Sequence, residues 1–297
     1  MKEDALLELF YDYLKYDKSV SNNTFQAYKS DLSCYFAYIS DKGISDIEAT
    51  SEDIENFKCT IKEEGRATSS VSRCLSSVRA FYSFLQKNNF ISLNPARSVR
   101  NDKSEAKQFD TLTAEEIDTL ISQPCGSDEK SVRDRAILEI LYATGLKVSE
   151  LIALDFSDFN ASLSTIHCAN SKGSKERVIP LYPKAKKLLS QYLSNSRKYL
   201  VFDENEPALF VNINGTRMTR QGLWKIIKQY ATLAGIEKEI TPGTLRHSFA
   251  THLLENGADV SMLRDVLGHS DISSTNMYVN FLKRKSNNSL MKFHPHA

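Results

Sequence analysis

The 297-residue sequence has few cysteines, and their spacing suggests neither a cross-link nor a metal site. Secreted disulfide frameworks and zinc sites need paired or clustered cysteines. No C-x-x-C pair occurs here, and the cysteines are odd in number and widely spaced: Cys34, Cys59, Cys74, Cys125 and Cys168. We therefore expect reduced cysteines, mostly in apolar core positions, and a cytoplasmic protein.

Long apolar runs and common metal or nucleotide motifs are also missing. The longest mainly apolar stretch, residues 136–146, is too short to cross a bilayer, and the acidic start MKEDALLELFYDYL is unlike a signal peptide. No H-E-x-x-H pair occurs, and His247 and His252 do not share a helical face. The order of glycine and lysine in NSKGSK does not match a Walker loop. The sequence thus predicts no metal and no cofactor.

The formal net charge is only +1, but two consecutive segments are each poor in charges of one sign: the first in basic residues, the second in acidic ones. Residues 1–64 hold seven Lys and no Arg against fourteen acidic residues. Residues 65–101 hold no acidic residue and six basic ones: Arg66, Arg73, Arg79, Lys87, Arg97 and Arg100. Such a segment indicates either a surface for a polyanion or a solvated charged face, and both interpretations stay open at this point.

The length and the apolar pattern predict two domains. Residues 1–98 read as helical, and the stripe in TSSVSRCLSSVRAFYSFLQK follows a helical period. Its opposite face carries serines between long cations, a composition suited either to a phosphate backbone or to plain solvent. Residues 99–112 lack periodicity and predict a linker, after which the capping pattern TAEE opens a second domain, residues 113–297.

The second domain combines helices with one clear β signal. Residues 164–169 and 176–181 are short β-branched runs that flank NSKGSK, which predicts a β-hairpin. Lys172 lies at its tip, with Lys175 and Arg177 beside it. Further along, Arg246 occupies the first turns of a predicted helix, where the helix dipole does not favour a cation.

The stretch GHSDISSTNMYVNF adds His269 and Tyr278. Arginine, lysine, histidine and tyrosine side chains can stabilise a pentacovalent phosphate without a metal ion or a nucleotide. An isolated histidine and tyrosine are more often ordinary parts of a capped helix, so these two residues do not by themselves establish an active site.

Several long strings resemble the tyrosine recombinase (integrase) family of the XerC/XerD type, over essentially the whole sequence. They are TFQAYKSDL, ATSSVSRCLSSVRAFYSFL, DRAILEILYATGLKVSELIAL, SKGSKERVIPL, MTRQGLWKIIKQYATLAGI, LRHSFATHLLENGADV, LGHSDISSTNMY and the terminal HPHA. The resemblance implies a mainly α protein with a small β-hairpin or sheet. Its N-terminal helical, SAM-like domain would clamp DNA, and a mixed α/β domain would be catalytic.

The resemblance also implies roles for individual residues. Tyr278 would be the nucleophile that forms a 3′-phosphotyrosyl link, and Lys172 would protonate the leaving 5′-oxygen. Arg246 would clamp the scissile phosphate and His269 would donate a hydrogen bond to it. The cations expected to contact DNA are Arg66, Arg73, Arg79, Lys87, Lys175, Arg177 and Arg220.

Two positions depart from the family pattern. Lys147 stands where ATGLRxSE has the first catalytic arginine, and lysine lacks the planar fork that grips two oxygens. Gly243 stands where H-x-x-R has its histidine. These changes leave an alternative open, a DNA-binding and synapsis partner with weakened catalysis. A helical transcription regulator is a third interpretation, but it gives Tyr278 no purpose.

As partners, the resemblance implies double-stranded DNA and a tetramer on two DNA sites, either homomeric or shared with a paralogous recombinase, with a DNA translocase as a further partner. The tail from Leu282 resembles a terminal helix that docks on a neighbouring subunit. The biological role would be either chromosome dimer resolution or the movement of a genetic element.

Overall fold

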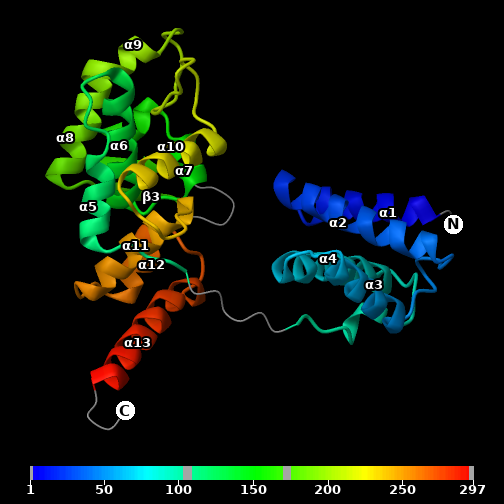
Figure 1. The fold of residues 1–297 in the computed structure, drawn as a ribbon. Coiled ribbons are helices and arrows are strands. Elements are labelled where there is room, and N and C mark those ends of the chain that lie inside the picture. The colour runs from blue at the N-terminus through cyan, green and yellow to red at the C-terminus, as the bar shows by residue number, and fades with distance from the viewer. Residues whose placement is uncertain (1–2, 103–108, 170–174, 294–297) are drawn as a thin grey trace. The chain divides into compact units, whose positions relative to one another are not determined.

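The computed structural model describes residues 3–102, 109–169 and 175–293, and the chain divides into two compact units, Met1–Lys107 and Gln108–Ala297 (Figure 1). Each unit has its own hydrophobic core. Three parts of the sequence discussed above lie outside the described residues: 103–108 in the expected linker, 170–174 with Lys172, and the last four residues of the tail.

The first unit is helical. Its α-helices in the described residues are α1 (Glu3–Asp12), α2 (Asn22–Asp41), α3 (Ser51–Glu63) and α4 (Thr68–Lys87). A π-helical turn (Tyr13–Asp17) extends α1, and a 3-10 turn (Pro95–Arg97) follows α4. The predicted stripe of α4 is its buried face, with every member at most 3% exposed: Val71, Cys74, Leu75, Val78, Phe81, Tyr82 and Leu85.

The second unit places a small sheet among helices. In the described residues its helices are α5 (Ala114–Ser122), α6 (Glu129–Thr144), α7 (Val148–Ala153), α8 (Pro183–Tyr192), α9 (Lys198–Leu200), α10 (Arg220–Leu233), α11 (Pro242–Glu255), α12 (Val260–Leu267) and α13 (Ser273–Phe293). Short 3-10 and π turns cover Phe156–Asp158 and Leu193–Arg197. Among the described residues no helix is both long and apolar enough to span a bilayer.

The predicted hairpin is confirmed as the pair β2 (Thr165–Cys168) and β3 (Arg177–Pro180). The strands are antiparallel, with Ile166 opposite Ile179 and Cys168 opposite Arg177. A two-residue strand, β1 (Phe159–Asn160), pairs with β2 and makes a third strand that the pattern had not predicted, since two residues carry no visible alternation.

Helix α6 is the central helix of the second unit and packs against α8 and α11. It ends at Gly145, which adopts the left-handed conformation (φ 59°). A Cβ at this position would lie 2.3 Å from a ring carbon of Phe249 on α11, so both the backbone and the neighbour require glycine. Helices α11, α12 and α13 then gather at one end of this unit, next to the end of α6 (Figure 1).

The close approach at Gly145 predicts a stability loss on Gly145→Ala. We expect about 2–4 kcal/mol in the free energy of unfolding, because the left-handed backbone and the contact with Phe249 both add cost. Urea unfolding measures this. Gly235 is the matched control, since it has a similar φ of 66° with nothing within 4 Å of an added Cβ. Equal losses in Gly145→Ala and Gly235→Ala would contradict the role of Phe249.

Candidate active site and nucleic-acid interface

Glu150 is a buried carboxylate at the centre of a group of cations. It lies in the first turn of α7, 4% exposed, and its Oε2 accepts the backbone N–H of Lys147 at 2.8 Å. Arg177 on β3 donates to both of its oxygens, at 2.9 and 3.2 Å. The Nη1 atom of Arg246 is 3.8 Å from Oε2. One negative charge therefore holds parts of α7, β3 and α11 together.

The guanidinium of Arg246 is fixed by the ends of two helices. This residue is 7% exposed, and its Nη1 donates to the Gly145 carbonyl at 2.6 Å, while its Nη2 donates to the Leu267 carbonyl at 2.9 Å. These carbonyls lie at the C-terminal ends of α6 and α12, where the helix dipole favours a cation. The unfavourable position of Arg246 in its own helix is thus offset by two neighbouring helices.

His269 connects Arg246 to α13. Its Nε2 is 2.9 Å from Nη2 of Arg246, and its Nδ1 is 2.9 Å from the Thr275 hydroxyl oxygen. Arginine can only donate, so Nε2 is the acceptor and Nδ1 carries the proton. Burial, together with the charge of Arg246, lowers the pKa of His269 to about 4. In this state the imidazole is neutral and orients Arg246.

Tyr278 on α13 is 1% exposed and points into the same cluster. Its hydroxyl oxygen is 3.0 Å from Nδ1 of His247 on α11. Burial raises the pKa of the Tyr278 hydroxyl, while the charge of Arg246 and a hydrogen bond from it act in the opposite direction. The phenol therefore lies between a guanidinium and an imidazole of its own chain.

Lys147 is half-buried at the start of α7, at the edge of this cluster. Burial lowers the pKa of its ammonium group, with Glu150 opposing the shift and Arg246 and Arg177 adding to it. The structure thus brings Lys147, Arg246, His269 and Tyr278 together. Within the described ranges, no group of three or more His, Cys, Asp or Glu side chains could hold a metal ion.

Arg177 does not occupy the outward position expected of a DNA contact. Its side chain is only 7% exposed, and besides its pairing with Glu150 it donates from Nε to the Val266 carbonyl at 2.6 Å. Arg177 therefore fixes β3 against α12 from inside the unit. Lys175 is exposed, and its backbone N–H donates to the Gly268 carbonyl at 3.2 Å, next to His269.

Pattern reasoning missed three contributors to this site. Glu150 stands in the string ATGLKVSE, where a carboxylate beside an expected phosphate cation was a usable signal. His247 directly follows Arg246, but its approach to Tyr278 depends on how α11 packs against α13. Phe109 comes from the expected linker, and its ring stacks on His247 with centroids 4.6 Å apart.

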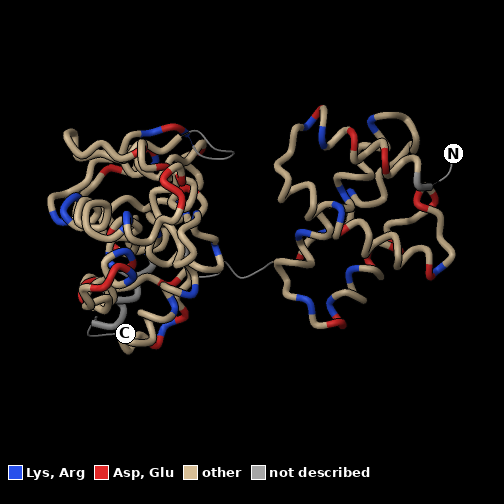
Figure 2. Tube along the Cα trace, turned by 90° about the horizontal axis from the view of Figure 1, so that it is seen from above, with Lys and Arg blue, Asp and Glu red and all other residues tan. Residues whose placement is uncertain are grey.

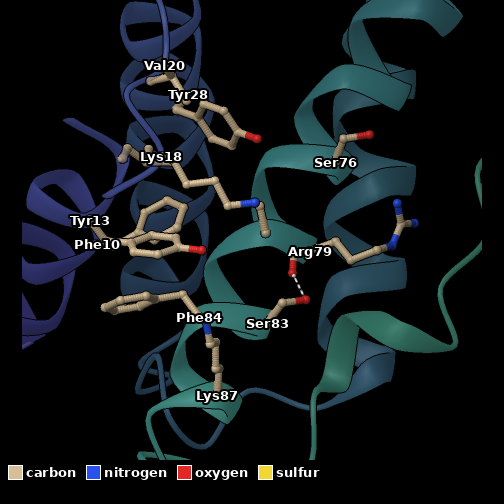
Figure 3. Close-up of a pocket in the computed structure, with 12 residues that line it drawn as sticks. Phe10, Tyr13, Lys18, Val20, Tyr28, Ser76, Arg79, Ser83, Phe84 and Lys87 are labelled. Carbon is tan, nitrogen blue, oxygen red and sulfur yellow. Dashed lines mark hydrogen bonds between the residues drawn. The ribbon is translucent and has the colours of Figure 1, made fainter. Parts of the chain in front are cut away.

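A pocket of about 390 Å³ lies on the polar side of α4 in the first unit (Figure 3). Phe10, Tyr13 and Tyr28 line one side, and α4 contributes serines and cations to the other. The α4 members are Ser76, Arg79, Ser83 and Lys87. This arrangement of cations, hydroxyls and aromatic rings suits a phosphate backbone.

The cations expected to contact DNA differ in how far they are engaged within their own unit. Lys87 and, in the second unit, Arg220 are exposed. Arg73 is 52% exposed in its side chain but donates to the buried carboxylate of Asp31 at 2.8 Å. Arg79 donates to the backbone carbonyls of Ala96 and Val99, and Arg66 pairs with Glu64 at 3.4 Å.

The acidic residues of segment 1–64 and the basic residues of segment 65–101 are not separated from one another in space. Figure 2 shows acidic and basic residues interspersed along the trace of each unit. Acidic groups of the first sixty residues lie beside the basic segment, as the contact between Asp31 and Arg73 illustrates.

The low pKa of His269 predicts a pH-dependent part of the stability. Between pH 6.5 and about 4 the unfolded histidine binds a proton that the folded one does not, so the free energy of unfolding falls as the pH is lowered through this range. His269→Gln should lose less stability over the same interval. Urea unfolding of both proteins at pH 6.5 and pH 4.5 checks this, and an equal loss in both would contradict it.

Comparison with known families and relatives agrees with this arrangement. The model described as "Phage integrase family" matches residues 110–285, and "Phage integrase, N-terminal SAM-like domain" matches residues 7–89. The protein named tyrosine recombinase XerD of Oceanobacillus iheyensis is 42% identical over 294 residues, covering 98% of each chain. The protein of the same name from Halalkalibacterium halodurans is 40% identical over 293 residues, again covering 98% of each.

Solved structures share the fold. XerH recombinase bound to a palindromic difH substrate aligns with a TM-score of 0.76 at 22% identity, covering 89% of this chain and 78% of that one. XerA recombinase aligns with a TM-score of 0.55 at 25% identity, covering 98% and 99%. By its family matches and its relatives, the chain belongs to the phage integrase family, as a site-specific tyrosine recombinase of the XerC/XerD type.

Proposed function

We propose that this recombinase cuts a DNA strand with Tyr278, which becomes linked to the 3′-phosphate while a 5′-hydroxyl is released. The observation that carries the proposal is the position of the Tyr278 hydroxyl, between Arg246 and His247 of the same chain. A buried tyrosine beside a fixed guanidinium is an arrangement suited to attack on a phosphodiester, because the cation stabilises the charge that develops on phosphorus-bound oxygens.

Each neighbour has a separate role in this proposal. Arg246, whose plane is set by the Gly145 and Leu267 carbonyls, binds the non-bridging oxygens of the phosphate. His269 keeps that guanidinium in place, and Lys147 adds positive charge. Lys172, which lies outside the described residues, is the proposed acid for the leaving 5′-oxygen. The bond energy stays in the protein–DNA link, so rejoining to another strand needs no ATP.

The alternative of a partner with weakened catalysis is not favoured by the relatives, which are named recombinases over nearly the full length of this chain. Lys147 places an ammonium group near Arg246, and the negative charge of Glu150 favours the protonated form of that group. Lysine at position 147 therefore offers fewer oriented N–H donors than the arginine of the family, but it still places a basic group there.

We further propose double-stranded DNA as the substrate and a tetramer on two DNA sites as the active assembly, in the cytoplasm. The XerH structure is a DNA complex, and a lambda integrase dimer bound to a core site shares the fold at a TM-score of 0.73 and 17% identity. A paralogous recombinase and a DNA translocase are proposed as further partners. Resolution of chromosome dimers and movement of a genetic element are the two proposed roles.

A suicide substrate, nicked close to the cleavage site, tests the function. The wild-type protein should form a covalent DNA adduct that is visible as a retarded band on a denaturing gel. Tyr278→Phe should form none, because it lacks the hydroxyl that attacks phosphorus, while it binds the same DNA. Specific binding without any adduct by the wild type, or an adduct with Tyr278→Phe, would contradict the proposal.

The pocket on α4 predicts a measurable electrostatic contribution to DNA binding. If Lys87 contacts a phosphate, Lys87→Gln should reduce the slope of log Kd against log salt by about 1, with little sequence dependence. Lys42, an exposed lysine after the end of α2, provides the matched control as Lys42→Gln. Equal slopes for Lys87→Gln and the wild type would show that this side of α4 does not face DNA.

A further inference from the structure

We propose that His247 is the proton acceptor for Tyr278 during strand cleavage, a role that rests on Tyr278 being the nucleophile. Its Nδ1 lies 3.0 Å from the Tyr278 hydroxyl oxygen, which is a direct hydrogen-bonding distance. Among the described residues, the other group placed against this hydroxyl is Arg246, which has no acceptor atom. Proton removal therefore falls to the imidazole.

The packing around His247 fixes the ring in this orientation. The Phe109 ring stacks on it, at 4.6 Å between centroids and 30° between planes, and also meets the edge of Tyr278. The Phe109 ring is itself stacked against the Phe281 ring, with their centroids 4.6 Å apart. These apolar contacts hold the imidazole and the phenol at hydrogen-bonding distance and keep most water away from them.

The charge state of His247 suits a base. Burial and the positive charge of Arg246 lower the pKa of His247 below its ordinary 6.5, so the ring is neutral at pH 7. Three neighbours face it: Arg246 on its own helix, Tyr278 from α13 and the uncharged Phe109 ring. For Nδ1 to accept a proton, Nε2 must carry the ring hydrogen.

Gly243 explains why this chain can place the base one turn further along α11. A Cβ built at position 243 would lie 3.3 Å from Nε2 of His247 and 3.6 Å from the Thr241 hydroxyl oxygen. Side chains at positions 243 and 247 thus face the same space, as residues four apart on a helix do. Because glycine stands where H-x-x-R has its histidine, position 243 puts no side chain into this space beside Nε2 of His247.

The step balances as follows. The Tyr278 hydroxyl gives its proton to Nδ1 of His247, and its oxygen forms a bond to phosphorus as the bond from phosphorus to the 5′-oxygen breaks. That oxygen takes a proton from the acid, which the proposed function assigns to Lys172. On rejoining, a 5′-hydroxyl gives its proton back to the deprotonated Lys172 as its oxygen bonds to phosphorus. The bond from phosphorus to the Tyr278 oxygen breaks, and that oxygen recovers the proton from the imidazolium. The negative phosphate offsets the repulsion between this imidazolium and Arg246.

Single-turnover adduct formation with His247→Gln tests the proposal, because glutamine keeps a polar side chain but cannot take up the proton. We expect the adduct to form about 100-fold more slowly, at unchanged DNA affinity. The wild-type rate should fall as the pH is lowered through the pKa of His247, which lies below 6.5, and His247→Gln should lack this fall. A rate for His247→Gln within about threefold of the wild type would overturn the proposal.

A substrate with sulfur in place of the 5′-bridging oxygen separates a base from an acid. A thiolate leaves without protonation, so this substrate should restore cleavage to Lys172→Ala but not to His247→Gln. Restoration of His247→Gln would assign His247 to the leaving group and overturn the proposal. If the wild type itself forms no adduct with either substrate, it is the proposed function that fails.

His247→Ala with added imidazole separates a chemical role from a structural one. Free imidazole should increase the rate of adduct formation by His247→Ala and leave the wild type unchanged, since it supplies the missing proton acceptor. A variant that unfolds is identified by its circular dichroism spectrum, and His247→Gln then serves for all comparisons. No increase in a folded His247→Ala would overturn the proposal.

Discussion

The buried carboxylate of Glu150 allows the rest of the candidate active site to exist. Arg177 and Arg246 are almost completely removed from water, and Lys147 is half-buried near them. Cations at such distances repel one another strongly once the solvent is excluded. Glu150 offsets this repulsion and accepts hydrogen bonds from two parts of the chain. The phosphate of a substrate would add the negative charge that this excess of cations still lacks.

Backbone geometry contributes as much to the site as side-chain charge does. Two helices end so that their terminal carbonyls converge on Arg246, and one of these ends requires glycine at position 145. The sheet contributes through Arg177, which ties β3 to α12. The candidate active site is therefore assembled from several separate elements of the second unit, and the placement of each side chain depends on the packing of that unit's core.

Much of the fold could be predicted from the sequence, because helical periodicity and the β-branched hairpin are local patterns. The buried stripe of α4 and the pair β2 and β3 are examples. The family strings also singled out Arg246 and Tyr278. Local patterns could not reveal that Arg177 faces inward, or that His247 contacts Tyr278, because both depend on which elements pack together across the unit. In the sequence, Gly243 indicated only the loss of the H-x-x-R histidine. The structure shows that His247 borders the space where that side chain would lie.

The contacts of His269 form a closed circuit with helix α13. The path leaves α13 at Thr275, passes through His269 and Arg246, and returns to the same helix at Tyr278, one turn later. A rotation or shift of α13 would break this circuit at both of its ends at once. The placement of the tyrosine and the orientation of the arginine are thus coupled, because both depend on where the beginning of α13 lies.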